Sequence, residues 1–462
     1  MGKRFDYEYI VIGGGIAGIT AAKQLAEAGR KVAIVEKNLL GGNSTVFHDV
    51  PSSMVFNITQ LYARAIAGNR FGLSTSSLKY DYNILQAWRQ KSIIKANTTA
   101  KHDLDTLGVA VIQGRARFIG NYDLAIDGNE KIKTVSASKF IVATGTVLET
   151  NGISGIDVVP FLTPNSALSV VRPPKAALIV GGGTTGCEIA QYYSSLGAKV
   201  VIVELSDRIL PSEDEDISKV IYQHLTKRCN VKIFTGTRVT SLQKDNSLTR
   251  VSFMRGGEEK TVRVETVVLA TGYKPNTDLD LPNAGVSFDK KGIVVDRTLQ
   301  TSNRNVYAIG GVIDTHSSTE RAIYTGEVAV MNMLDRTKTF VNYDGFMRCM
   351  DTDPQLAIVG LTEDDLLKRH RKYRKVIIPL SSITASIVHD ETAGFIKILA
   401  DSQGKILGAA MIGPNASEVL QEIALAIRHN LPLIEVASTP HKENDWNNLV
   451  RVAAKKLLLT NK

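Results

Sequence analysis

The stretch that decides the fold is Tyr9-Ile10-Val11-Ile12-Gly13-Gly14-Gly15-Ile16-Ala17-Gly18. Its apolar run predicts a buried strand, and the amphipathic pattern that continues to about Ala28 predicts a helix directly after the glycines. A second strand, Lys31 to Val35, and the acid Glu36 follow. A strand, a glycine turn, a helix, a second strand and an acid, in that order, are typical of a dinucleotide-binding unit.

Each glycine of this turn has its own physical reason. Gly13 permits the tight turn, Gly15 lets a pyrophosphate approach the backbone, and Gly18 lets the helix and the strand pack closely. The helix N-terminus offers free N–H groups to the phosphates. Glu36 is placed to accept hydrogen bonds from a ribose diol. We therefore expect one dinucleotide to bind along this turn.

The same order recurs further along the chain. The apolar strand Ala176 to Val180 is followed by Gly181-Gly182-Gly183-Thr184-Thr185-Gly186 and by a helix through Leu196. The next strand, Val200 to Val203, ends at the acid Glu204. Two complete units in one chain predict two dinucleotides, and a flavin with a nicotinamide is the simplest pair.

The second acid also bears on which nicotinamide binds. Glu204 would repel a 2′-phosphate, which favours NADH over NADPH. Arg208 lies four residues further on and keeps NADPH open as the less favoured alternative.

Length and composition describe an ordinary globular protein. The 462 residues predict about three domains at roughly 150 residues each. No apolar run approaches the ~20 residues that cross a bilayer, and the first strand leaves no room for a signal peptide. The three cysteines lie far apart and form no CxxC spacing, which fits a reducing compartment and indicates no metal site. We expect a cytoplasmic protein without an integral membrane segment.

The net charge of +9 raises the question of an anionic partner. The densest basic run is 368–375, and Thr362 with the acids after it predicts a helix N-terminus just before that run. We interpret the run as the solvated, cation-favouring end of this helix and expect no nucleic acid partner. An anionic surface remains the alternative.

Further motifs extend the pattern over nearly the whole chain. They are two Ala-Thr-Gly strand ends, an apolar stretch that ends in paired glycines, and small motifs in the last third. These motifs are Ala143-Thr144-Gly145, Ala270-Thr271-Gly272 with Tyr273-Lys274-Pro275-Asn276, residues 301–312, Asp353-Pro354, residues 359–363, residues 394–397 and residues 407–409.

With these motifs the chain resembles the pyridine nucleotide–disulfide oxidoreductases, such as lipoamide dehydrogenase, mercuric reductase and the soluble transhydrogenase. The resemblance implies an α/β fold with two Rossmann-like dinucleotide-binding domains and a C-terminal α+β dimerisation domain. It implies an FAD-binding domain over 1–147 and 278–341, an NAD(P)-binding domain over 148–277 and a dimerisation domain over 342–462. It also implies a homodimer in which one C-terminus completes the partner's active site.

The resemblance and the two dinucleotide-binding units, one from Tyr9 to Glu36 and one from Ala176 to Glu204, together give the expected cofactor residues. For FAD these are Gly13, Gly15, Gly18, Glu36, Lys37, Gly42, Asn43, Ala116, Thr144, Gly145, Gly310 and Gly311. For NAD they are Gly181, Gly183, Gly186, Glu188, Glu204 and Gly272.

The residues that carry disulfide chemistry in the family are absent. The two redox-cysteine positions, just before a turn expected at Pro51-Ser52, hold Ser44 and Asp49. Neither side chain can cycle between dithiol and disulfide. The lysine expected near the flavin is Ser53, whereas its partner Glu188 is present. Asp49 and Glu188 are therefore the remaining catalytic candidates, since each could place an anion near the flavin.

The acid/base end of the chain has changed as well. An ungapped alignment puts Glu443 at the catalytic histidine and Asn448 at its supporting glutamate. If the register slipped, His441 could be the base, but we expect it to lack a supporting acid. The resemblance also places an aspartate that binds the ribityl chain at Gly311, and an aromatic gate at Thr184.

These observations predict an FAD-dependent NADH oxidoreductase that passes electrons from the flavin directly to a small acceptor. A quinone, oxygen or a second nicotinamide would serve as the acceptor. The alternative is a catalytically degenerate nucleotide-binding dimer with a sensor or scaffold role. An active disulfide or mercuric reductase would need a cysteine pair from elsewhere in the chain.

Overall fold

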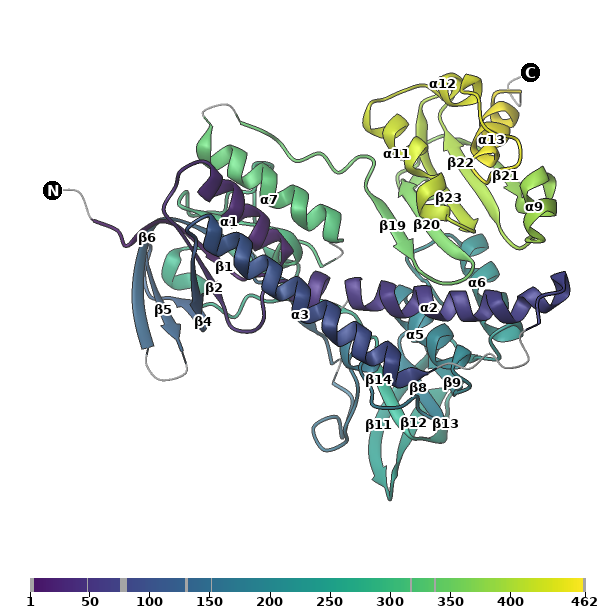
Figure 1. Ribbon diagram of the computed structural model, residues 1–462, viewed down its shortest axis with the longest axis horizontal. Coiled ribbons are helices and arrows are strands. Elements are labelled where there is room, and N and C mark those ends of the chain that lie inside the picture. The colour runs from purple at the N-terminus through teal and green to yellow at the C-terminus, as the bar shows by residue number, and fades with distance from the viewer. Residues whose placement is uncertain are drawn as a thin grey trace. The chain divides into compact units, whose positions relative to one another are not determined.

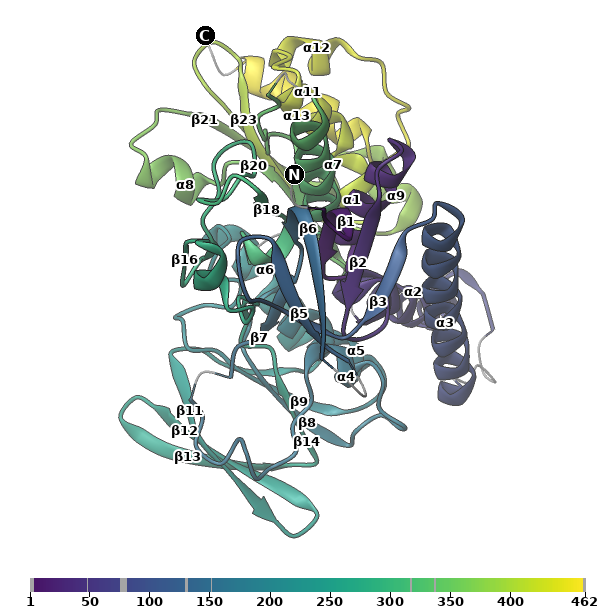
Figure 2. The same cartoon turned by 90° about the vertical axis from the view of Figure 1, so that its left-hand side faces the viewer.

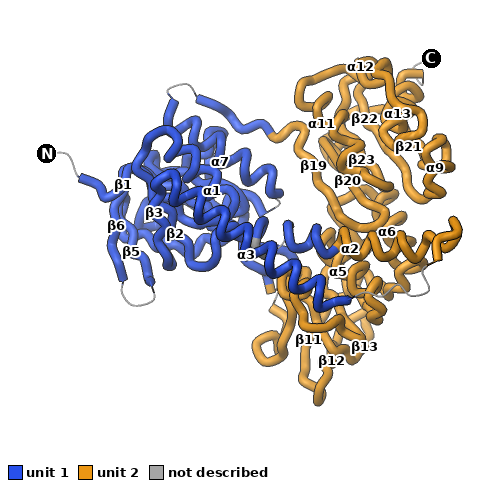
Figure 3. The backbone as a smooth tube through the Cα atoms, viewed as in Figure 1, with its two compact units in different colours: residues 1–55, 79–149, 272–342 blue, residues 56–78, 150–271, 343–462 orange. Residues whose placement is uncertain are grey.

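The computed structural model describes residues 4–47, 49–74, 81–128, 132–150, 152–315, 318–335 and 338–459. The chain divides into two compact units, each discontinuous in sequence (Figure 3). Unit 1 comprises residues 1–55, 79–149 and 272–342, and unit 2 comprises residues 56–78, 150–271 and 343–462.

Unit 1 is built on a seven-stranded sheet in the order β3-β2-β1-β6-β5-β4, with β18 also paired to β6. The strands β3, β2, β1, β6 and β18 pair in parallel, and the hairpin β4–β5 continues the sheet in antiparallel pairing. The strand bounds are β1 Tyr7–Ile12, β2 Val32–Glu36, β3 Ala110–Gln113, β4 Arg115–Phe118, β5 Asp123–Asp127, β6 Ile132–Val142 and β18 Val306–Ala308.

Helices cover one face of this sheet, and α1 and α7 lie side by side on it (Figure 1). The helix bounds are α1 Ile16–Glu27, α3 Tyr82–Thr106 and α7 Thr319–Leu334. The buried cluster between sheet and helices includes Val11, Leu25, Leu104 and Ile141. Burying each such side chain is worth about 1.5–3 kcal/mol, so this layer fixes the glycine turn between β1 and α1.

Two small antiparallel pairs complete unit 1. They are β7 Thr146–Leu148 with β15 Tyr273–Pro275, and β16 Phe288–Asp289 with β17 Gly292–Ile293. Helix α2 (Asp49–Ala67) starts in unit 1 and ends in unit 2. The turn expected at Pro51-Ser52 is wrong, because these residues lie in the first turn of α2, where proline is tolerated since no intrahelical N–H is needed there.

Unit 2 contains a four-stranded parallel sheet in the order β10-β9-β8-β14, and the second glycine turn follows β8 in this sheet. It also contains a three-stranded antiparallel sheet, β11-β12-β13 (Figure 2). The strand bounds are β8 Ala176–Val180, β9 Lys199–Val203, β10 Lys232–Phe234, β11 Thr237–Asp245, β12 Leu248–Arg255, β13 Glu258–Val264 and β14 Thr266–Leu269. The helices are α4 Pro164–Ala167, α5 Thr184–Ser195 and α6 Glu215–Lys227.

The last third of the chain adds a five-stranded antiparallel sheet in the order β19-β20-β23-β22-β21. Its bounds are β19 Met347–Met350, β20 Gln355–Gly360, β21 Arg374–Pro379, β22 Phe395–Ala400 and β23 Ile406–Gly413. The accompanying helices are α8 Glu363–Lys368, α9 Thr384–His389, α10 Ala416–Val419, α11 Gln421–Arg428, α12 Leu433–Ser438 and α13 Asn448–Leu459. Ile396, Met411, Leu449 and Ala453 are buried between the sheet and the helices.

A buried lysine joins the two parts of unit 2. Lys397 on β22 is 1% exposed, and its Nζ lies 2.6 Å from Asp214 Oδ2 and 2.8 Å from Asp216 Oδ1 at the start of α6. Asp214 also accepts hydrogen bonds from the backbone N–H groups of Glu363 and Asp364. The network therefore ties α6 to the antiparallel sheet through a buried Lys397–Asp214 pair, with Asp216 at its partly exposed side.

The basic run 368–375 is only partly the helix end that the sequence predicts. Thr362 caps α8 as expected, but α8 ends at Lys368, and the last two basic residues belong to β21. Lys375 Nζ lies 2.6 Å from Glu363 Oε1, and the Tyr373 hydroxyl donates to the same oxygen. That hydrogen bond is the main cause that raises the pKa of Tyr373 to about 12. Among the described residues, no helix combines the length and the apolarity needed to cross a bilayer.

Candidate nucleotide-binding sites

In the first glycine turn, the fold requires glycine at positions 13 and 18 but not at position 15. A Cβ on Gly13, whose φ is +108°, would lie 2.4 Å from the Ala143 carbonyl oxygen, and one on Gly18 would lie 2.0 Å from the Gly13 oxygen. Gly15 has an ordinary φ of −72°. Apart from Gly15 and its chain neighbours, no heavy atom of the described residues lies within 4 Å of a Cβ built on it. Gly15 therefore leaves a cradle that fits a pyrophosphate.

The second turn repeats this geometry. Gly181 also has a φ of +108°, and a Cβ there would lie 2.2 Å from the Ala270 oxygen. A Cβ on Gly186 would lie 2.1 Å from the Gly181 oxygen, whereas Gly183 again faces open space. The chain thus holds two independent cradles, one in each unit, and the residues at both fit a dinucleotide.

Each expected ribose acid is held by the middle glycine of its turn. Glu36 Oε2 accepts a 2.6 Å hydrogen bond from the Gly14 N–H, and Oε1 accepts one of 2.7 Å from Asn38. Glu204 accepts equivalent bonds of 2.6 and 2.7 Å from the N–H groups of Gly182 and Ser206. The sequence motif alone did not reveal that the middle glycines bind the acids through their N–H groups. The equal spacing from middle glycine to acid in both turns is the signal for it.

The remaining FAD candidates lie mostly around the first cradle. A Cβ on Gly42 would lie 2.8 Å from the Gly15 Cα, and Asn43 begins the π-helical turn Asn43–Phe47. Thr144 Oγ1 donates to the Asn276 oxygen at 2.7 Å, next to Gly145 with φ +66°. Gly310, with φ +69°, and Gly311 follow the end of β18. Lys37 lies beyond β2 and is exposed, whereas Ala116 is buried on β4.

At the first redox-cysteine position, Ser44 lies in the π-helical turn of unit 1. Its Oγ lies 2.5 Å from Thr319 Oγ1 at the start of α7. Asp49 is the first residue of α2, but its side chain and His48 lie outside the described part of the chain. A hydroxyl pair therefore occupies the place where the resemblance would put a reactive sulfur.

Glu188 has a structural partner in unit 2. The side chain is 92% buried on α5, and Oε1 accepts a 2.8 Å hydrogen bond from the Asp351 N–H. Gln191 exchanges two hydrogen bonds with the Asp353 backbone, and Gln60 Nε2 donates to the Asp351 oxygen at 3.1 Å. These contacts assign Glu188 a part in holding the 351–353 loop, whatever the cofactor.

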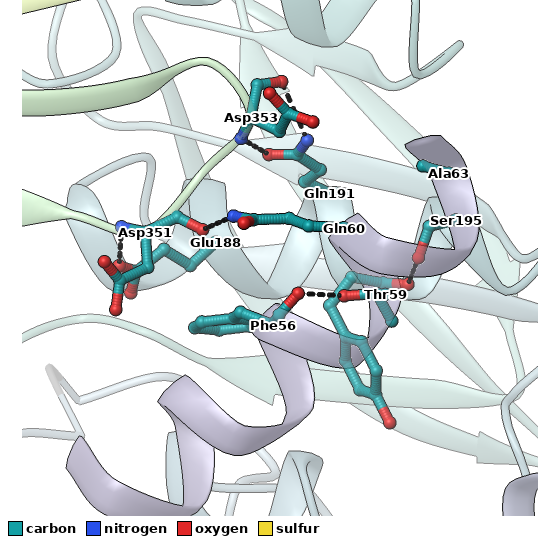
Figure 4. Close-up of a pocket in the computed structure, with 10 residues that line it drawn as sticks. Phe56, Thr59, Gln60, Ala63, Glu188, Gln191, Ser195, Asp351 and Asp353 are labelled. Carbon is teal, nitrogen blue, oxygen red and sulfur yellow. Dashed lines mark hydrogen bonds between the residues drawn. The ribbon is translucent and has the colours of Figure 1, made fainter. Parts of the chain in front are cut away.

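The side chains of Glu188, Gln191 and Gln60 line a pocket and point toward the 351–353 loop (Figure 4). It is lined by Phe56, Thr59, Gln60, Ala63, Glu188, Gln191, Tyr192, Ser195, Asp351 and Asp353. No lysine or arginine contributes to this lining. Of the other NAD candidates, Gly272 has φ +98° beyond β14, and Thr184 at the gate position is exposed.

The expectation that His441 lacks a supporting acid is wrong. His441 Nε2 lies 2.6 Å from Glu422 Oε2 on α11, and Nδ1 lies 2.9 Å from the Thr439 oxygen. Glu422 precedes His441 by 19 residues, so the motif that follows the histidine could not reveal it. Both ring nitrogens face protein oxygens, so His441 cross-links α11 to the Thr439 backbone.

The two substituted acid/base positions are not paired as a dyad. Glu443 is exposed, whereas Asn448 is 1% exposed at the start of α13 and donates weakly to the Glu443 backbone oxygen at 3.5 Å. Trp446 is buried and stacks on the His389 ring with centroids 5.4 Å apart. Trp446 and Asn448 are thus packed into the core of unit 2, whereas Glu443 lies at its surface.

We expect His441→Ala to lower the free energy of unfolding by about 1–3 kcal/mol, because the buried imidazole loses its hydrogen bond to the Glu422 carboxylate. Reduction of bound flavin by NADH should be unchanged. Urea denaturation and stopped-flow absorbance measure the two quantities. Glu443→Ala, an exposed change, is the control and should stay within about 0.5 kcal/mol. Slow flavin reduction in the stable His441→Gln protein would instead place His441 in the chemistry.

The three cysteines do not replace the missing pair. None of them forms a disulfide in the part of the chain that the structure describes, and all lie in unit 2. Cys187 is fully buried on α5, and its burial raises the pKa of the thiol well above the ordinary range. Burial also raises the pKa of Cys229 to about 11. In the described ranges, no group of three or more His, Cys, Asp or Glu side chains is placed to hold a metal ion.

Comparisons with known families and sequences agree over most of the chain. Residues 7–330 match the family described as pyridine nucleotide-disulphide oxidoreductase, and residues 347–443 match its dimerisation domain. A mercuric reductase from Bacillus cereus is 29% identical and covers 94% of this chain and 69% of its own length. A dihydrolipoamide dehydrogenase from Chaetomium thermophilum is 30% identical, with coverage of 94% and 88%.

Solved structures match the fold. An HOCl-induced flavoprotein disulfide reductase from Escherichia coli superposes with a TM-score of 0.88 at 23% identity and covers 99% of this chain and 100% of its own. LpdA from Mycobacterium tuberculosis gives a TM-score of 0.88 at 24% identity, with coverage of 97% and 99%. The expected α/β fold, with a nucleotide-binding region followed by a dimerisation domain, is confirmed.

Proposed function

Because the chain belongs to the pyridine nucleotide-disulphide oxidoreductase family, whose members are flavin oxidoreductases that use FAD and pyridine nucleotides, we propose that it oxidises NADH and reduces a small acceptor without a disulfide relay. A quinone, oxygen or a second nicotinamide would receive the electrons. The match to the dimerisation domain supports a homodimer.

The observation that carries the proposal is the hydroxyl pair at the first redox position. Ser44 Oγ contacts Thr319 Oγ1 at 2.5 Å, so this position is filled by a group that cannot form a thiolate or a disulfide. Unit 1, which holds the first cradle, contains no cysteine at all in its sequence. The tightly buried Cys187 could not act as a substitute, since a raised pKa removes its thiolate.

The cofactor assignment follows the two cradles. Gly13, Gly15 and Gly18 would hold FAD with Glu36 on its ribose, and Gly181, Gly183 and Gly186 would hold NADH with Glu204 on its ribose. Bound FAD would supply the acceptor for the hydride of NADH. We retain 1–147 with 278–341, 148–277 and 342–462 as the proposed FAD, NAD(P) and dimerisation domains.

An anaerobic experiment tests the proposal. The purified protein, loaded with FAD, is mixed with NADH, and the visible flavin absorbance is followed before and after addition of a quinone, oxygen or a nicotinamide analogue. The proposal expects loss of absorbance with NADH and recovery with at least one of these acceptors. A protein that binds both nucleotides but shows no loss of absorbance would instead be a nucleotide-binding dimer with a sensor or scaffold role.

The preference for NADH gains support from the position of Arg208. Its guanidinium Nη2 donates to Asp364 Oδ2 at 2.9 Å and to the Glu213 backbone oxygen at 3.2 Å. These contacts engage the one arginine that the sequence offered for a 2′-phosphate. We therefore propose NADH as the reductant.

Glu204→Ala is expected to raise the KM for NADH by roughly 10-fold, because a hydrogen bond to a charged group is worth about 1.5 kcal/mol or more. It should leave NADPH nearly unaffected, since the carboxylate opposes the 2′-phosphate in the original protein. Initial rates with both nucleotides measure the ratio. Arg208→Ala is the matched variant at the other residue considered for nucleotide choice. If Arg208→Ala selectively weakened NADPH use, the assignment of Arg208 to Asp364 and Glu213 would be contradicted.

A further inference from the structure

Three strand ends meet at one corner of unit 1. In the parallel sheet, Ile12 of β1 pairs with Val142 of β6, and Val142 pairs with Ala308 of β18. The segments that follow these strands therefore leave the sheet at the same edge. In open α/β sheets, ligands bind outside this carboxyl edge.

The strand order gives the direction in which a dinucleotide would lie along this edge. The ribose acid Glu36 ends β2, the pyrophosphate cradle Gly15 follows β1, and β6 with β18 lies on the other side of β1. A dinucleotide with its adenosine at β2 and its pyrophosphate at β1 must continue over the ends of β6 and β18. In FAD that continuation is the hydroxylated ribityl chain.

Thr146 and Gly311 are packed together at this corner. A Cβ on Gly311 would lie 2.9 Å from Thr146 Cγ2 and 3.4 Å from the Gly145 Cα, so the threonine methyl fills the space that a side chain at 311 would need. The methyl faces Gly311, and the hydroxyl stands on the other branch of the same Cβ. Packing against Gly311 thus fixes the direction of the hydroxyl.

The Thr146 hydroxyl differs from its polar neighbours in having no partner among the described residues. Thr144 Oγ1 donates to the Asn276 oxygen at 2.7 Å, and the Asn276 N–H donates to the Gly145 oxygen at 2.9 Å. Within the part of the chain that the structure describes, the half-buried Thr146 hydroxyl makes no hydrogen bond. It is therefore the polar group at this corner that is left to meet a ligand.

We propose that the Thr146 hydroxyl hydrogen-bonds the ribityl chain of FAD, in place of a side chain that Gly311 does not provide. This inference rests on the proposed flavin chemistry and adds a binding residue to it. A hydroxyl both donates and accepts, which suits a polyol. The Thr146 methyl keeps this hydroxyl in position by packing on Gly311.

The test measures the FAD dissociation constant of the apoprotein by flavin fluorescence. Thr146→Val keeps the methyl against Gly311 and removes the hydroxyl, and it should raise the constant by about 3–10-fold. Thr146→Ser keeps the hydroxyl and should stay within about twofold. Thr134→Val, an exposed threonine on β6 in the same unit, is the matched control and should leave the constant unchanged.

A second pair of variants tests the packing without relying on Thr146→Val. Gly311→Ala should weaken FAD binding, because its Cβ displaces the Thr146 methyl, and adding Thr146→Ser should restore binding. The inference is overturned if the original protein binds FAD and Thr146→Val binds it equally well, or if Thr146→Ser fails to rescue Gly311→Ala. A protein that binds FAD normally but is not reduced by NADH would contradict the proposed function and leave this inference standing.

Discussion

Gly183→Val is expected to abolish the loss of flavin absorbance on addition of NADH while FAD stays bound. The backbone at Gly183 is extended, with φ −73°, and no described residue other than its chain neighbours has a heavy atom within 4 Å of the new Cβ. Loss of helix capping should cost about 1 kcal/mol of stability. The side chain would instead block the pyrophosphate from the backbone N–H groups, and losing two such bonds lowers NADH affinity on the order of 100-fold.

Two companion variants make this result specific. Gly15→Val should lose FAD and leave NADH binding in place, because the first cradle is equally open. Gly120→Val, at a loop glycine whose nearest contact is Asp123 Oδ2 at 3.7 Å, should change neither. Isothermal titration with each nucleotide separates the two effects. Loss of FAD from Gly183→Val, or of NADH from Gly15→Val, would contradict the assignment of the two cradles.

Lys397→Met is expected to lower the free energy of unfolding by about 3–5 kcal/mol, because it leaves the carboxylates of Asp214 and Asp216 facing a buried site without their cation. Chemical denaturation followed by circular dichroism measures this loss. Lys375→Met removes an exposed lysine that pairs with Glu363, and it should cost no more than about 1 kcal/mol. Adding Asp214→Asn to Lys397→Met should recover part of the loss. Equal effects of the two lysine changes would contradict a buried network.

The free energy of unfolding that Lys397→Met loses should also depend on pH. Burial alone would raise the pKa of Asp214, but the Lys397 ammonium and the backbone amides of Glu363 and Asp364 hold it below its ordinary value. An acid with a lower pKa in the folded protein stabilises the fold above its unfolded pKa, and this contribution disappears as the pH falls through the folded pKa. The difference between the original protein and Lys397→Met should therefore be largest near neutral pH and shrink in acid.

The fold could be predicted from the sequence because its decisive features are local. Gly13 and Gly181 adopt the same left-handed φ. A strand ends directly before each of these glycines, and the helix and second strand that the apolar pattern indicates lie between the glycine and its acid. Pro51 misled the prediction, since a proline in the first turn of a helix and one in a β-turn give the same local signal.

The candidate site was less predictable because its contacts cross long stretches of chain. Glu422 reaches His441 from α11, and Glu188 holds the Asp351 amide 163 residues away. The contact of Ser44 with Thr319 spans 275 residues. The spacing of residues reveals motifs on one element, whereas these pairs depend on how the sheets bring separate elements together.

The central claim is that electrons leave NADH without passing through protein thiols. An anaerobic NADH titration of the FAD-loaded protein, combined with a thiol count before and after reduction, tests it most directly. The account predicts that about one equivalent of NADH per flavin removes the visible absorbance and that the thiol count stays at three, one for each cysteine of the sequence. A requirement for a second equivalent, with new thiols appearing on reduction, would contradict it.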